Sequence, residues 1–170
     1  MANPRQLDKR RKSIKNIRKI TRTMELIATA RFKQAMDRAA AATAYTQRIT
    51  QLVADLAQSG LEVSHPLLEE REKTENASLL VLSANRGLCG GYNSNVVRLG
   101  QASQKDLSAE IPNLEVAVSG KRGINGLKFR KVPVDVTYTQ FEDKPAYEEV
   151  EAIAEGFPDR YATGQLDRLD

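Results

Sequence analysis

A glycine-rich stretch, SANRGLCGGYN at residues 83–93, holds the residue types most suited to chemistry. It follows the apolar run SLLVL and precedes NSNVVRLG, so the expected order is a strand, a glycine turn and a helix. Proteins bind phosphate groups in this setting, because backbone N–H groups at a helix N-terminus point at the anion. The stretch is therefore a candidate nucleotide site.

The spacing of the glycines matches neither common phosphate-binding motif. Gly87, Gly90 and Gly91 give G-x-x-G-G, whereas a dinucleotide loop has G-x-G-x-x-G and a P-loop places a lysine after its last glycine. Glu110, the acidic residue about 20 positions on, falls between a helix and a strand rather than at the end of a strand. Three interpretations remain: a strand-to-helix turn, a phosphate site, and a surface for close approach of a partner. We favour the turn, formed by Arg86, Gly87, Cys89, Gly90 and Gly91.

Other groups of residues that could form a catalytic or metal site have even less support in the sequence. The chain has one histidine, His65, and one cysteine, Cys89, and no carboxylates stand at a spacing that would complete a zinc site with them. No group that sequence can identify would orient these two residues as a nucleophilic pair. We therefore predict no catalytic residue, no metal and no cofactor. A single cysteine also excludes an internal disulfide and fits a reducing compartment.

The first 60 residues are predicted to form one long helix. No glycine or proline occurs from Arg5 to Ser59, Asn3 can cap the start, Pro4 suits the first helical position and Gly60 suits the stop. Such a helix of about 55 residues would be roughly 80 Å long, which is typical of a coiled coil or a helical shaft.

An apolar seam with a period of 3.5 residues supports the coiled coil. The rest of the chain is too small to bury so long a helix, and it contains no second long helix. Another chain, a second copy, or sequence outside this chain must then cover the seam. Its positions are Ile14, Ile17, Thr21, Met24, Ala28, Arg31, Ala35, Arg38, Ala42, Tyr45, Ile49, Leu52 and Leu56.

The remaining sequence is predicted to be an α/β domain. Strands alternate with helices, which indicates a parallel sheet in a three-layer α/β/α arrangement. The predicted strands are 78–84, 114–120 and 132–138, and the helices are 93/94–108, 121–129 and 145–157. Three strands make a small, incomplete sheet. The expected organisation is a shaft helix over 1–60, a linker over 61–76 that contains His65-Pro66, and a partial Rossmann-like domain over 77–170.

Positive charge is concentrated at the N-terminus. Residues 1–22 hold nine Lys and Arg against one acid, whereas the chain after residue 38 has 14 basic and 19 acidic residues. A basic helix of this kind indicates an acidic partner. One alternative is therefore a nucleic-acid-binding helix protein, although no aromatic side chains interleave with the charges as they do in single-strand binders.

Two motifs point to a known family. KSIKNIRKITRTMELIATARF at 12–32 and LSANRGLCGGYNSN at 82–95 resemble signatures of the gamma subunit of F-type ATP synthases, and the similarity continues through GKRG at 120–123 to TGQLDRLD. The resemblance implies a non-catalytic central-stalk rotor subunit, with a coiled-coil shaft and a Rossmann-like foot. In that family the shaft turns inside a hexamer of alpha and beta subunits, and the foot sits on the c-ring beside the epsilon subunit. Neither nucleic acid nor a catalytic nucleotide is then a ligand.

The resemblance also implies where partners bind. The basic collar would face acidic lever loops of the beta subunits, with Lys9, Arg10, Lys12, Lys19, Arg22, Met24 and Glu25 as the contact residues. The expected location is the cytoplasmic side of a bacterial plasma (inner) membrane, with membrane contact only through the c-ring. Family members continue past LDRLD with further strands and a long helix, so this chain is interpreted as a fragment or a shortened product.

Overall fold

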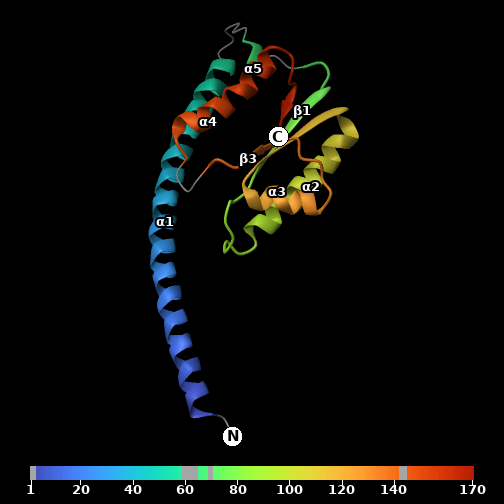
Figure 1. Ribbon diagram of the computed structural model, residues 1–170. Helices are drawn as coiled ribbons and strands as arrows, with labels where there is room; N and C mark the ends of the chain where they lie inside the picture. Colours follow the sequence, from blue (N-terminus) through green and yellow to red (C-terminus); the bar gives the residue numbers. More distant parts are fainter. Residues whose placement is uncertain (1–2, 59–64, 69–70, 142–144) are drawn as a thin grey trace. The chain divides into compact units, whose positions relative to one another are not determined.

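A computed structural model gives the structure of the chain, which separates into two compact units, Met1–Val63 and Ser64–Asp170. Each unit is described by itself (Figure 1). The structure describes residues 3–58, 65–68, 71–141 and 145–170.

The first unit is the long helix α1, Pro4–Gln58 (Figure 1). Its start is the predicted one, because Pro4 is the first helical residue and the side-chain oxygen of Asn3 accepts a hydrogen bond from the N–H of Arg5 at 3.1 Å. The predicted stop at Gly60 lies outside the described residues. The prediction of one helix of about 55 residues is thus confirmed for Pro4–Gln58.

Threonine hydroxyls along α1 bond to the helix itself. Each donates to the carbonyl oxygen four residues earlier, at 2.8–3.0 Å. These donors are satisfied within the helix, without a partner or a second element. The residues are Thr21, Thr23, Thr29, Thr43 and Thr46.

The second unit is built on a parallel sheet with the order β3-β2-β1-β4. The strands are β1 (Asn76–Leu82), β2 (Asn113–Ser119), β3 (Val136–Tyr138) and β4 (Arg168–Leu169). The expectation of three strands was therefore wrong, because the sheet has four. Strand β3 is also shorter than the predicted 132–138, and Pro133, which has no N–H to donate to a ladder, stands in the part that is not a strand.

Helices connect and cover the strands. They are the 3-10 turn η1 (Pro66–Leu68), α2 (Tyr92–Glu110), α3 (Lys121–Phe129), α4 (Tyr147–Ala154) and α5 (Gly156–Ala162). The span of α3 is the predicted one. The single helix expected over 145–157 is instead two helices, with Gly156 opening the second.

Strand β1 shows how the layers form, because its side chains alternate between the two faces of the sheet. Ala77, Leu79 and Val81 join the buried core that contains residues of α2 and α3. Leu80 and Leu82 line a cavity on the other face with residues of α4 and α5. The unit therefore has three layers, and the predicted α/β class with a parallel sheet is confirmed. The partner helix of the expected coiled coil stays a prediction.

Candidate functional site

The glycine-rich stretch joins β1 to α2, as the sequence places it. Gly90 is the only one of its three glycines with a positive φ, at 57°. Leu88 has a φ of 63°, in the left-handed region that residues with a side chain rarely adopt, and its side chain is 94% exposed. The sequence pointed to the glycines and gave no sign that a leucine would take this conformation.

Asn93 holds the turn together. Its side-chain oxygen accepts a hydrogen bond from the N–H of Ala84 at 3.1 Å, and its Nδ2 donates to Cys89 Sγ at 2.9 Å. The helix was expected to begin at residue 93 or 94, but α2 begins at Tyr92 and its N-cap is Gly91, with no side-chain hydrogen bond at the cap. The side chain of Asn93 instead bonds to residues of the loop before the helix, and these bonds close the turn.

The N-terminus of α3, which lies next to this turn, is already satisfied by protein atoms. The N–H groups of Lys121, Arg122 and Gly123 donate to Asn85 Oδ1, Ala84 O and Ser83 Oγ, at 3.0, 3.1 and 2.8 Å. These three N–H groups therefore already have acceptors from the protein. At the start of α2, which the glycine stretch precedes, the N–H of Tyr92 donates to Cys89 O at 3.3 Å, and the Asn93 side chain bonds within the loop. These contacts within the loop favour the turn interpretation.

Ser83 is the centre of this arrangement. Its hydroxyl donates toward the carbonyl oxygens of Ser119 and Gly120, at 2.8 and 3.0 Å, while it accepts from the N–H of Gly123. A β-carbon at Gly120 would stand 2.1 Å from Ser83 O, and one at Gly123 would stand 2.4 Å from Ser83 Oγ. Glycine is required at both positions because β1 and α3 approach so closely.

A polar hollow of about 470 Å³ opens at the carboxyl ends of the strands beside this turn. Its lining includes Asn85, Arg86, Lys121 and Gln140. Arg86 thus lies where the sequence placed it, in the turn, while Lys121 was not predicted as a site residue. Parallel strands bring these residues together because the loops after β1 and β2 leave the sheet at the same edge.

The predicted collar on α1 is solvent-exposed over its whole length. Arg22 and Glu25 pair with each other at 2.8 Å, and Lys12 pairs with Asp8 at 3.1 Å. Such exposed pairs are each worth only about 0–1 kcal/mol, so they hold the side chains weakly. The predicted collar residues, all on α1, are Lys9, Arg10, Lys12, Lys19, Arg22, Met24 and Glu25.

The predicted seam is exposed as well. Ile14 is 61% and Leu52 is 54% exposed, and the smaller seam residues between them are also exposed. Exposed isoleucine and leucine at a 3.5-residue spacing are expected of a helix whose partner is another segment or chain. The structure thus leaves the seam uncovered within the described residues.

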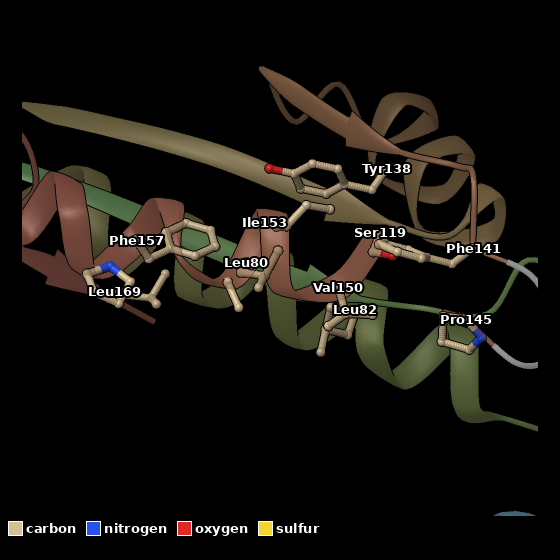
Figure 2. Close-up of a pocket in the computed structure, with 12 residues that line it drawn as sticks. Leu80, Leu82, Ser119, Tyr138, Phe141, Pro145, Val150, Ile153, Phe157 and Leu169 are labelled. Atoms are coloured by element: carbon tan, nitrogen blue, oxygen red, sulfur yellow. The ribbon is translucent and has the colours of Figure 1, made fainter. Parts of the chain in front are cut away.

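A second cavity was not predicted from the sequence. It has a volume of about 590 Å³ and lies between the sheet and α4 and α5, where Val150, Ile153 and Phe157 face Leu80 and Leu82 (Figure 2). Its lining is almost wholly apolar. The signal was present in the sequence, because Val150, Ile153 and Phe157 recur at a helical spacing of three and four residues.

Among residues 3–58, 65–68, 71–141 and 145–170, no three His, Cys, Asp or Glu side chains gather so that they could hold a metal ion. None of the helices in the same described ranges combines the length and the apolar character that crossing a bilayer requires.

Comparison with known proteins identifies the family. Residues 3–170 match the family model described as ATP synthase. The chain is 63% identical over its full length to the ATP synthase gamma chain of Rhodopirellula baltica and 37% identical to that of Leptospira biflexa. It spans 57% and 59% of those two chains, so it covers little more than half the length of these relatives.

More distant relatives have the same name. The chain is 34% identical over 172 residues to the ATP synthase gamma chain of Synechococcus elongatus, of which it covers 54%. It is 18% identical, with a TM-score of 0.49, to a chain of the Euglena gracilis mitochondrial ATP synthase rotor, a similarity too low to add to the assignment. No comparison supports the nucleic-acid-binding alternative. With the family model matched from residue 3 to residue 170, the chain belongs to the ATP synthase family, and the relatives named here are gamma chains.

Proposed function

We propose that this chain is part of the central-stalk rotor subunit of an F-type ATP synthase, which couples transmembrane proton flow through the c-ring to ATP synthesis or hydrolysis. The observation that carries the proposal is α1: one 55-residue helix whose seam side chains are exposed. A globular enzyme would bury such a stripe in its core, because exposed apolar area is unfavourable in water. A shaft leaves it for a second long helix.

The chain itself has no catalytic role in this proposal. Catalysis belongs to the beta subunits, and rotation of the asymmetric shaft changes the state of their sites. The contacts within the glycine turn support a structural part for it, since the side chain of Asn93 bonds to Ala84 and Cys89 across the turn. The glycine turn then shapes the foot and binds no ATP.

The collar suits a shaft that turns against its partner. Its charged side chains are exposed, and each pair that they would form with an acidic lever loop of a beta subunit is screened and worth about 0–1 kcal/mol. Many weak pairs attract the shaft to the lever loops at long range, and no single pair is strong enough to hold the shaft at one rotational angle. The collar would therefore hold the shaft against the loops and still allow it to slide.

Partners and location follow from the same proposal. The alpha and beta subunits surround the shaft, while the epsilon subunit and the c-ring contact the foot. The chain is then a peripheral protein on the cytoplasmic side of a bacterial plasma (inner) membrane. The strands and the helix that complete the foot and the coiled coil would come from sequence beyond the span matched here, since the relatives are longer.

The test is binding to a hexamer of alpha and beta subunits. We expect the chain to bind, with an affinity that falls as salt is raised. The triple variant Lys9→Gln, Arg10→Gln, Lys12→Gln should bind more weakly and with a smaller salt dependence. The matched control is Arg48→Gln, an exposed basic residue of the same helix outside the collar, which should bind like the parent chain.

Two results would count against the proposal. One is equal loss of hexamer binding in the triple variant and in Arg48→Gln, which would show that general charge and not the collar matters. The other is selective binding of DNA at physiological salt with no binding to the hexamer. The second result would restore the nucleic-acid alternative.

A further inference from the structure

The apolar cavity of Figure 2, called the α4 cavity below, lies under a helix that does not pack onto the strands. Helices α2, α3 and α5 each have buried residues, whereas none of the residues of α4 is buried. Val150, which faces the cavity, is 42% exposed. Protein interiors are closely packed, with few voids larger than a water molecule, so a space of about 590 Å³ between two layers is unusual.

The register of the strands builds the floor of the α4 cavity. Leu82 pairs with Ser119 and Ser119 pairs with Tyr138, so these residues form one row across the carboxyl ends of β1, β2 and β3. Val81 and Val118, which point to the opposite face, belong to the core with α2 and α3. The floor is therefore apolar toward β1 and has two hydroxyl groups toward β3.

The two hydroxyl groups are available to a ligand. The backbone oxygens of Ser119 and Tyr138 accept hydrogen bonds from the N–H groups of Ser83 and Gly120, at 2.8 and 3.0 Å. Within the described part of the chain, however, no hydrogen bond joins either side-chain hydroxyl to a protein group. The described lining residues include no charged side chain. A charged ligand would lose its hydration there without a partner, so the cavity favours a neutral one.

Neither water nor a further element of secondary structure is suited to fill the α4 cavity. An ordered buried water makes about three hydrogen bonds, and the walls are apolar apart from the two hydroxyl groups. A helix is about 10–12 Å across with its side chains, and α4 and α5 already cover this face. A further strand would pair at an edge of the sheet and not above its face. A small molecule fits, because ligand sites have volumes of about 300–1,000 Å³.

We propose that the α4 cavity binds a neutral small molecule with an apolar ring system and one hydrogen-bonding group, a hydroxyl or a carbonyl. The ring system packs against Ile153 and Phe157, and the polar group bonds to the hydroxyl groups of Ser119 and Tyr138. The bound molecule fills the space under α4 and so ties that helix to the sheet. This site goes beyond the rotor proposal, since its described lining residues all belong to the second unit.

Two probes of matched shape test the site. They are 2-naphthol, which has a hydroxyl group, and 2-methylnaphthalene, which has a methyl group in its place. Each is titrated into the chain and followed by NMR of the Leu, Val and Ile methyl groups. We expect the methyl signals of Leu80, Val150 and Ile153 to shift and to saturate with a single probe bound. Dye fluorescence would not decide the point, because the exposed seam of α1 also attracts apolar dyes.

The hydroxyl group of the probe should matter. For one hydrogen bond, 2-naphthol should bind about fivefold more tightly than 2-methylnaphthalene. The double variant Ser119→Ala, Tyr138→Phe should bind the two probes equally, because it keeps the shape of the site and removes its hydroxyl groups.

A variant that fills the cavity and a matched control complete the design. Ala154 lines the α4 cavity, while Ala152 is an exposed residue of the same helix and is not among the lining residues. Ala154→Phe should weaken the binding of both probes about tenfold, since its ring takes up the same space. Ala152→Phe should bind them like the parent chain. The amide spectrum of each variant checks that the sheet is folded.

The titration is repeated on a chain of the relatives' full length, where the same methyl groups should shift. Four results would overturn the proposal: no shift of the cavity methyl groups, equal binding of the two probes by the parent chain, equal weakening in Ala154→Phe and Ala152→Phe, and shifts in this chain that are absent from the longer one. The last would show that sequence outside this chain fills the cavity. None of them bears on binding to the alpha and beta subunits, which has its own test.

Discussion

Replacing Gly120 with alanine should be among the most damaging single changes in the second unit. Gly120 follows β2 and precedes α3, with a φ of 96° and a ψ of 130°. This region of backbone space is nearly restricted to glycine, and a side chain there costs about 1–3 kcal/mol. The added β-carbon would also stand 2.1 Å from the backbone oxygen of Ser83.

The steric cost can be worked from the neighbouring hydrogen bonds. Ser83 can move away only by breaking its bond from N to Ser119 O, at 2.8 Å, and Gly120 can move only by breaking its bond from N to Tyr138 O, at 3.0 Å. Each lost bond costs about 1 kcal/mol. With the conformational strain included, we expect Gly120→Ala to lower the free energy of unfolding by about 3–5 kcal/mol.

The measurement should report on the sheet alone. Because α1 supplies much of the helical signal, urea-dependent hydrogen exchange at the amides of β2 is a better probe than circular dichroism. Gly90→Ala is the matched control: its φ is also positive, at 57°, but a β-carbon there would meet nothing within 4 Å. Strain alone should cost that variant about 1–2 kcal/mol. If the two variants lose equal stability, the contact with Ser83 does not matter and the reasoning is refuted.

Three further predictions concern pH, the seam and the core. The N–H groups of Asn76 and Glu75 donate to the carboxylate of Asp167 and lower its pKa below the ordinary value of 3.8. Its stabilising effect is therefore present above that pH and is lost as pH falls through the folded-state pKa. When the free energy of unfolding is measured as a function of pH, Asp167→Asn should be less stable than the parent chain at neutral pH. In acid the two chains should be equally stable. For the seam, Ile17→Ala should change the helicity and the melting temperature of this chain little, because an exposed substitution is usually worth within about 0.5 kcal/mol. In a chain of the relatives' full length, the same change should cost about 2–5 kcal/mol if a partner helix covers Ile17, and an equally small effect there would contradict the seam. For the core, urea unfolding should show a loss of about 2–5 kcal/mol for Leu127→Ala, against almost none for Phe129→Ala, and similar losses would contradict the burial of Leu127.

The parts of the fold that the sequence predicted are those with strong local signals. Asn3 and Pro4 mark the start of α1, and the absence of glycine and proline up to Ser59 gives its length. Strands β1 and β2 are predicted because most of their central residues are buried and so read as apolar runs. The span of α3 follows from Gly120 and the apolar spacing after it.

The parts that were missed depend on contacts between distant residues. Strand β4 is two residues long and reads RL, so only its pairing with Ala77 and Ser78 makes it a strand. Asn93 has a residue type that often caps helices, but its side-chain oxygen accepts a hydrogen bond from the N–H of Ala84 in the loop. The apolar cavity beside α4 requires knowing which face of the sheet that helix covers.

The candidate site divides in the same way. Composition showed the excess of basic residues over 1–22, because charge is visible in sequence. The collar residues were taken from the family resemblance, and their contacts with partners remain a proposal. The glycine turn was located, but the positive φ of Leu88 was not foreseen, since nothing in the residue type favours it. The bond from Arg130 to Gln101 was not foreseen, because these residues are far apart in sequence and meet only when α3 packs beside α2.

Thr21 changes the expected thermodynamics of pairing along α1. Its hydroxyl donates to Ile17 O at 3.0 Å, so the seam position that looks polar in sequence already has its hydrogen bond. A partner helix that covers Thr21 would meet its methyl group and would not strip water from an unsatisfied donor. The methyl group of Thr21 therefore adds to the apolar area that the partner helix buries. The heat-capacity change on association should be more negative than the value calculated from the apolar residues of the seam alone.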